Sequence, residues 1–293
     1  MIHRALLPKY VEVETSRLCN RSCQWCPNGH DDSRKQQELM CWNLFEKIAG
    51  ELQSVTYDGW IALHNYNEPL ANPRLQDELS WIQRVVPRAK TSIFTNGDLL
   101  TDERLNVLIG CGVAYVRVTL YPTASRISLP PSQPRLEAWL RAKHLSEDGR
   151  WTFSIVRQGL SAVAMYGKTH VEVISPDLRT YNWRGGTVLH LQAPRRSEPC
   201  FMTQHSLSID YKGRLKMCCN VYPDRSDHEH YVIGDAFHEP IFDLWNSARL
   251  EALRKAHAEA DWTSSPICSG CSQMLPQSQI DALNPSGLGE KVS

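Results

Sequence analysis

The chain lacks an excess of charge of either sign, because 32 lysines and arginines balance 32 aspartates and glutamates among 293 residues. Proteins that bind the nucleic-acid backbone usually carry a basic excess, so this balance disfavours a nucleic-acid partner. No apolar run approaches the roughly 20 residues of a membrane span, and the first residues lack the apolar stretch of a signal peptide. We therefore expect a cytoplasmic protein with no membrane partner, long enough for one large domain or for a large and a small one.

Cysteine, by contrast, is plentiful, with ten copies. Without a secretion signal, clustered cysteines are more often metal ligands than disulfide partners. Two cysteines are isolated, and the other eight form one group near the start of the chain and one near its end. This division predicts two metal centres. The isolated residues are Cys41 and Cys111, the first group is Cys19, Cys23 and Cys26, and the second is Cys200, Cys218, Cys219, Cys268 and Cys271.

The first group has the spacing C-x3-C-x2-C and follows Val11–Thr15, whose alternation of apolar and polar residues predicts a strand. A structural zinc site usually presents four ligands in two C-x2-C pairs, whereas three thiolates leave one metal position open. The spacing resembles the radical S-adenosylmethionine (radical SAM) superfamily. The resemblance implies that Cys19, Cys23 and Cys26 hold a [4Fe–4S] cluster whose free iron binds SAM, which is cleaved to a radical that takes hydrogen from carbon. A three-cysteine loop unrelated to that family is the alternative.

The same resemblance implies further SAM-binding residues. Trp25 stands where the family usually has an aromatic residue beside the adenine. His64–Leu70 is a variant of a Gly-Gly-Glu-Pro-like motif, with asparagines at the glycine positions, so Asn67 and Glu68 are candidates for holding the SAM ammonium. Thr119 stands where relatives place a polar group near the ribose. An ordinary turn at the motif and a plain strand residue at Thr119 remain the alternatives.

Segments with strand and helix patterns alternate through the first two thirds of the chain. Such alternation implies right-handed βαβ units around a parallel sheet, with the active site at the carboxyl ends of its strands. The resemblance implies a partial (β/α)6 barrel over residues 8–185, in the α/β class. The expected strands are 11–15, 60–63, 91–94, 115–120, 152–156 and 171–174, and the expected helices lie around 42–52, 72–86, from 101 onward and at 136–145.

The second cysteine group brackets a predicted β-hairpin, Ser206–Tyr211 and Arg214–Cys218, with a turn at Lys212-Gly213. An amphipathic helix is expected at Ile241–Ala258. The pattern resembles the Twitch domain, a shortened SPASM module that binds one auxiliary [4Fe–4S] cluster. A four-cysteine zinc site is the alternative. The resemblance implies a domain over residues 186–275, a polar tail at 276–293, and the ligands Cys200, Cys218, Cys268 and Cys271.

Between the two parts lies Thr180–Gly186, similar to the Asn-Arg-Gly-Gly-like element of Twitch and SPASM enzymes. The resemblance implies that Arg184 contacts a substrate hydroxyl; a brace at the domain junction is the alternative. It also implies dehydrogenation of a small sugar, aminocyclitol or nucleoside in natural-product biosynthesis. The auxiliary cluster would accept an electron, and an external one-electron reductant of flavodoxin or ferredoxin type would supply the first cluster.

Three other functions stay open. A radical SAM epimerase would quench the substrate radical with a thiol, and Cys219 is the candidate donor because adjacent strand residues point to opposite faces. A peptide-modifying radical SAM enzyme is the second. A redox-inert zinc protein that serves as a binding module is the third.

Overall fold

The computed structural model describes residues 7–30, 38–122, 131–145, 150–156, 159–178, 181–192 and 194–272. The predicted tail at 276–293 lies outside these ranges. In the described part of the chain, no helix is long and apolar enough to cross a membrane.

A single ten-stranded sheet, in the order β10-β9-β8-β1-β2-β3-β4-β7-β6-β5, runs through the molecule. The strands β8, β1, β2, β3, β4 and β7 are parallel, so their carboxyl ends meet at one edge. The strand bounds are Tyr10–Val13 (β1), Trp60–Ala62 (β2), Lys90–Thr95 (β3), Tyr115–Thr119 (β4), Thr152–Val156 (β5), Gly159–Tyr166 (β6), Thr169–Pro176 (β7), Ser206–Ile209 (β8), Arg214–Lys216 (β9) and Val232–Asp235 (β10).

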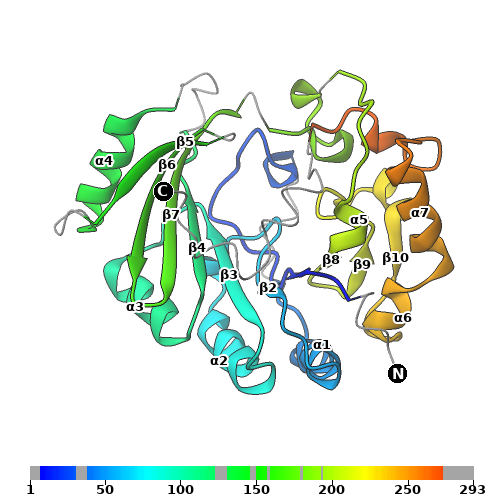
Figure 1. Cartoon of the computed structure of the whole chain (residues 1–293), viewed down its shortest axis with the longest axis horizontal. Helices are drawn as coiled ribbons and strands as arrows, with labels where there is room; N and C mark the ends of the chain where they lie inside the picture. The colour runs from blue at the N-terminus through cyan, green and yellow to red at the C-terminus, as the bar shows by residue number, and fades with distance from the viewer. Residues whose placement is uncertain are drawn as a thin grey trace, which may run out of the picture.

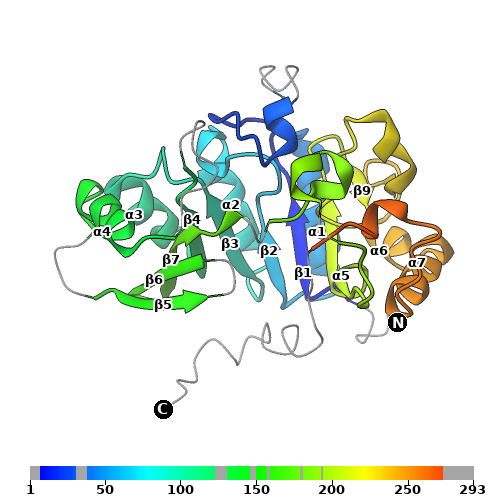
Figure 2. The same ribbon diagram turned by 90° about the horizontal axis from the view of Figure 1, so that it is seen from above.

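Four helices follow the outer side of the curved sheet, as Figure 1 and the view from above in Figure 2 show. Each buries an apolar stripe against the strands; α1, for example, buries Leu44, Phe45 and Ile48. Thr101 caps α3 by accepting a hydrogen bond from the Arg104 amide, as its position before two acidic residues predicts. The bounds are Trp42–Ser54 (α1), Leu75–Val85 (α2), Asp102–Gly110 (α3) and Gln133–Ala142 (α4).

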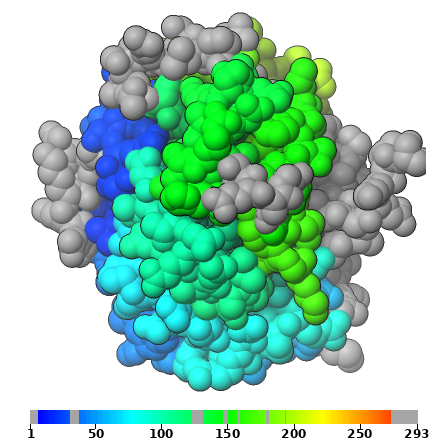
Figure 3. All heavy atoms as spheres, turned by 90° about the vertical axis from the view of Figure 1, so that its left-hand side faces the viewer, coloured from blue at the N-terminus to red at the C-terminus, as the bar shows by residue number. Residues whose placement is uncertain are grey.

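The predicted fifth strand exists, but it does not continue the parallel series. β5 pairs antiparallel with β6, which the sequence did not predict, and β6 pairs antiparallel with β7. Only two residues separate Val156 from Gly159, and a parallel connection needs a crossover of a dozen residues or more. The hairpin ends the sheet on the side that Figure 3 shows, where cyan and green segments cover most of the surface.

The C-terminal strands extend the sheet beyond β1. β8 is parallel to β1, and β9 returns antiparallel after a turn at Gly213, whose φ of +91° suits glycine. The predicted helix at 241–258 is divided, because Ser247 caps a new helix by accepting from the Leu250 amide. The bounds are Met202–His205 (α5), Ile241–Trp245 (α6) and Ala248–Ala258 (α7).

Candidate active site

The first cysteine group lies in the loop that follows β1, at the carboxyl edge of the parallel strands (Figures 1 and 2). Cys23 and Cys26 share a tight turn in which the Cys26 amide donates to the Cys23 carbonyl over 3.2 Å. Burial, together with the neighbouring thiols of Cys26 and Cys19, raises the pKa of the Cys23 thiol to about 12. Three thiols are therefore close enough to interact, as their spacing predicts.

Polar contacts fix this loop to the ends of the neighbouring strands. Arg21 forms a bidentate pair with Asp98, and its guanidinium lowers the pKa of that carboxyl group. Arg21 also donates to the carbonyl of Tyr121 over 3.2 Å. Gly29 packs against the loop so closely that a Cβ there would lie 2.0 Å from the Cys23 carbonyl oxygen. The close packing of Gly29, in addition to the cysteine spacing, therefore restricts the conformation of this loop.

The predicted SAM-binding residues lie around the same loop. Trp25 is buried and stacks on Tyr121 with 5.6 Å between ring centroids. Asn67 accepts from the Asn65 amide and donates to a serine of the cysteine loop. Thr119 ends β4 and is buried. The structure brings these side chains to one edge of the sheet, and their contacts with SAM stay predictions.

Glu68 is held from several sides. Its Oε1 accepts from the Thr95 hydroxyl at 2.6 Å and from the Leu70 amide at 3.1 Å, while its Oε2 accepts from the Asn96 amide at 2.7 Å. A carboxylate offers about four acceptor sites, so Oε2 keeps one for a further donor. Glu68 therefore connects the turn after β2 to the end of β3, whether or not it also contacts SAM.

Four cysteines of the second group, all except Cys219, line one small cavity together with His257. Burial raises the pKa of the Cys218 thiol, and the three other thiols add to that rise. His257 lies 3.9 Å from the sulfur of Cys268, and burial lowers its pKa to about 4, so the imidazole is neutral. Nothing in the sequence pattern indicated this histidine. The four cysteines of the cavity are Cys200, Cys218, Cys268 and Cys271, and their role as cluster ligands stays a prediction.

Arg184 connects the two parts of the chain. It has a positive φ of 52°, and Asn182 accepts from its amide at 2.8 Å. Its guanidinium donates to Asn220 over 3.2 Å and faces the ring of Tyr66 at 6.0 Å. Within the described residues, the buried Nε of Arg184 and the hydroxyl of Tyr66 have no hydrogen-bond partner. Arg184 thus braces the junction and still presents an unused donor.

Cys219 does not line the small cavity of the other four cysteines, although it packs against the buried cluster that contains Cys200 and Met202. Its carbonyl accepts from the Asn65 side chain at 3.2 Å. The thiol is close enough to Glu12, Arg184 and Lys216 for their charges to act on it. Cys41 is exposed, and Cys111 is buried.

Charged residues inside the sheet were missed by the sequence interpretation. Glu12 on β1 is 7% exposed, Glu14 directly after β1 is 5% exposed, and Lys216 on β9 is 1% exposed. The alternation in β1 predicted a strand correctly, but such alternation usually indicates one face in water. Here the polar face points to the interior, where Glu12 accepts from the Ser208 hydroxyl at 3.1 Å.

The donor sets suit iron–sulfur clusters. Thiolates are the usual ligands of [4Fe–4S] clusters, and the second cavity offers four of them in apolar surroundings with Met202. Among the described residues, no three His, Cys, Asp or Glu side chains converge as ligands of a single metal ion. Unpartnered buried donors near the first group, Trp25 Nε1 and Arg184 Nε, fit a site that receives further polar molecules.

Comparisons with known proteins agree with these observations. Residues 200–272 match the model of the SPASM family, described as an iron–sulfur cluster-binding domain. The chain is 25% identical over 270 residues to the S-adenosyl-L-methionine-dependent 2-deoxy-scyllo-inosamine dehydrogenase of Niallia circulans, covering 92% of this chain and 94% of that protein. It is 30% identical over 122 residues to the tungsten-containing aldehyde ferredoxin oxidoreductase cofactor-modifying protein of Pyrococcus furiosus, covering 41% of this chain and 33% of the relative.

The fold also matches a solved structure. The crystal structure of BtrN in complex with AdoMet and 2-DOIA has a TM-score of 0.72 with 23% identity, covering 93% of this chain and 96% of that one. The match confirms the predicted α/β fold class with its second, smaller part. The predicted cofactors, SAM and [4Fe–4S] clusters, are confirmed as well, and the ligand assignments stay predictions. The chain is therefore similar along most of its length to a radical SAM oxidoreductase, and its residues 200–272 match an iron–sulfur cluster-binding domain.

Proposed function

We propose that the protein oxidises a hydroxyl-bearing carbon of a small, sugar-like substrate, with Arg184 contacting the hydroxyl. The observation that carries this proposal is the unused, buried Nε donor of Arg184 beside the unpartnered hydroxyl of Tyr66. A buried donor without a partner costs free energy, so such a pair favours a bound acceptor. The similar protein of Niallia circulans is a dehydrogenase of an aminocyclitol, which agrees with this substrate class.

Asn220 and Asn182 determine how Arg184 acts. Asn220 accepts from one guanidinium nitrogen, and Asn182 holds the backbone of the arginine. Because an arginine keeps its charge at any ordinary pH, Arg184 acts as a binding group that stabilises the oxygen of the reacting carbon and not as a base. The planar fork leaves Nε directed away from Asn220, which gives the contact a defined orientation.

The cysteines would hold the redox cofactors. Cys19, Cys23 and Cys26 would bind the SAM-binding cluster, and the four cysteines of the second cavity would bind the auxiliary cluster. When bound, these groups supply one-electron cleavage of SAM, hydrogen abstraction and an acceptor for the second electron. The chain itself would orient the substrate and exclude water, with the buried Trp25 of the first loop stacked on the half-buried Tyr121. We infer that an external reductant of flavodoxin or ferredoxin type supplies the first electron.

Cys219 supports a second candidate function, epimerisation. Its thiol lies within electrostatic reach of Arg184 and Glu12, so a spare thiol stands beside the proposed substrate contact. A thiol that returns hydrogen to the opposite face of the carbon would leave no net oxidation. Incubation of the reconstituted enzyme with 2-deoxy-scyllo-inosamine in deuterated buffer separates the two functions. A ketone supports dehydrogenation, and solvent deuterium fixed on carbon supports epimerisation.

Variants then test the two residues. Arg184→Lys keeps the charge but loses the fork, so we expect product formation to fall on the order of 100-fold. Binding of SAM should stay unchanged, which serves as the control for folding and cluster content. Full activity of Arg184→Lys would refute the substrate contact. Loss of product in Cys219→Ser with continued cleavage of SAM would favour epimerisation.

A further inference from the structure

Lys216 is a fully buried lysine whose hydrogen bonding is incomplete. It ends β9 and is 1% exposed, whereas lysine is almost never fully buried unless it is paired. Its Nζ donates to the Asn65 side-chain oxygen over 2.9 Å and lies 5.4 Å from the centre of the Tyr66 ring. An ammonium has three donors, and in the described part of the chain one of them has a hydrogen-bond partner.

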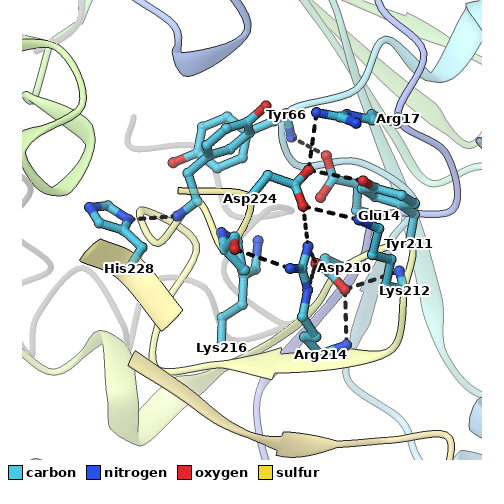
Figure 4. A network of polar contacts seen from close by, with 12 residues as sticks. Glu14, Arg17, Tyr66, Asp210, Tyr211, Lys212, Arg214, Lys216, Asp224 and His228 are labelled. Carbon is cyan, nitrogen blue, oxygen red and sulfur yellow. Dashed lines mark hydrogen bonds and ion pairs between the residues drawn. The ribbon is translucent and has the colours of Figure 1, made fainter. Parts of the chain in front are cut away.

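Arg214, two residues earlier on the same strand, shows the contrast. Its guanidinium pairs with Asp210 at 2.5 Å and with Asp224 at 2.7 Å, within the polar network of Figure 4. Lys212 on the same hairpin also reaches Asp224, at 3.4 Å. For Lys216, no carboxylate of the described residues lies within ion-pair distance of Nζ. The other cations of the hairpin are neutralised by direct contacts, and Lys216 is not.

The charge of Lys216 nevertheless acts through space on the pKa values of two buried carboxyl groups. Burial raises the pKa of Glu12 and that of Glu14, and the positive charge of Lys216 opposes both shifts. Glu12 lies on β1 and Glu14 directly follows the end of that strand, so the two residues are two positions apart in the chain. The ammonium therefore compensates these carboxylates without saturating its own donors.

The charges define what can bind beside Lys216. Lys216 and Arg184 bring two positive charges, and Glu12 and Glu14 bring at most two negative ones. An added ammonium would enter a region with no excess negative charge and would stand beside a buried cation, which is unfavourable in a low-dielectric interior. A hydroxyl oxygen, in contrast, can accept from the unused N–H groups at no such cost.

We propose that Lys216 is a substrate-binding residue that donates to a hydroxyl oxygen and selects a neutral polyol over a substrate that places an ammonium there. This inference rests on the proposed function, since it concerns the same site around Tyr66 and Arg184. It adds a specificity rule to that function: at the point of contact with Lys216, the substrate carries oxygen and not a protonated nitrogen.

Calorimetric binding to the anaerobically reconstituted enzyme with SAM tests the proposal. The two probes are 2-deoxy-scyllo-inosamine and the matched deoxyinositol in which a hydroxyl replaces the amino group. We expect the wild-type protein to bind the neutral probe at least about tenfold more tightly. In Lys216→Met the carboxylate of Glu12 loses its compensating cation, so we expect the preference to disappear or to reverse toward the amine.

Controls separate charge selection from folding. Lys212→Met removes a half-exposed lysine of the same hairpin and should keep the wild-type preference. If Lys216→Met fails to fold, the double variant Glu12→Gln/Lys216→Met removes both buried charges and should bind the two probes about equally. A wild-type preference for the amine, an unchanged preference in the Lys216 variants, or no binding of either probe would overturn the proposal. Selective binding without oxidation of the bound probe would instead refute the proposed function and leave the selection by Lys216 intact.

Discussion

Replacement of Glu14 by glutamine should remove a loss of folding stability that grows as the pH rises. Glu14 is 5% exposed and accepts a hydrogen bond from the Tyr66 amide at 3.1 Å. Burial raises its pKa from 4.5 to about 7, and the charge of Lys216 opposes part of that rise. The folded state therefore holds a proton on Glu14 that the unfolded chain has released. Stability falls as the pH rises from the unfolded pKa to the folded one and is constant above it.

The size of the effect follows from the shift. A difference of about 2.5 pKa units corresponds to about 3 kcal/mol of lost stability above neutral pH. For a chain of this size, that is on the order of 5–10 °C in the unfolding temperature. Glutamine keeps an acceptor for the Tyr66 amide and carries no charge. We therefore expect Glu14→Gln to resemble the wild-type protein near about pH 5 and to exceed its unfolding temperature near about pH 8.

Thermal unfolding followed by circular dichroism, on anaerobically reconstituted protein, measures this difference. Glu103→Gln makes the same chemical change on an exposed residue at the start of α3 and should leave the pH profile unchanged. Parallel profiles of Glu14→Gln and the wild-type protein over this pH range would refute the assignment of a protonated, buried Glu14.

Two further predictions concern the cysteine groups. Gly29→Ala places a Cβ against the Cys23 carbonyl, so it should lower bound iron by about half and abolish SAM binding, while Gly50→Ala, with open space around its Cβ, should change neither. Alanine at Cys200, Cys218, Cys268 and Cys271 together should also lower iron by about half but should leave SAM binding largely intact; unchanged iron content would contradict the second site.

Local signals allowed much of the fold to be predicted. The turn before β9 contains Gly213 at a positive φ, and Thr101 caps α3, so both elements have causes within a few residues. The cysteine loop follows β1 as expected, since a parallel strand delivers its loop to the carboxyl edge. The hairpin of β5 and β6 was not predicted as such. Its partner β7 lies further along the chain, and strand direction depends on that tertiary pairing.

The polar interior could not be predicted from the pattern. Glu12 and Glu14 alternate with valines, and the same alternation describes a strand with one face in water. In the folded chain β1 pairs with β8, from a segment almost two hundred residues away, so tertiary structure determines what surrounds that face. The Ser208 hydroxyl, which contacts Glu12, comes from this distant strand. Likewise, Lys216 becomes a buried charge only because Asn65 and Tyr66 close over it.

The adjacent residues Cys218 and Cys219 connect the cavity of the second cysteine group with the proposed substrate site around Arg184. Cys218 lines the cavity of the second cysteine group, while the neighbouring residue faces the buried charges around Arg184. A two-residue segment after β9 therefore belongs both to the auxiliary domain and to the proposed substrate site. Dehydrogenation needs an electron acceptor near the substrate. The peptide bond between Cys218 and Cys219 joins the cavity of the second cysteine group directly to the proposed substrate site. Epimerisation needs a thiol at the substrate, and the same segment provides it. Under the proposed functions, oxidation would use the group held at Cys218 as electron acceptor, whereas epimerisation would use the Cys219 thiol as hydrogen donor. Cys219→Ser therefore tests epimerisation without removing a residue of the second cavity.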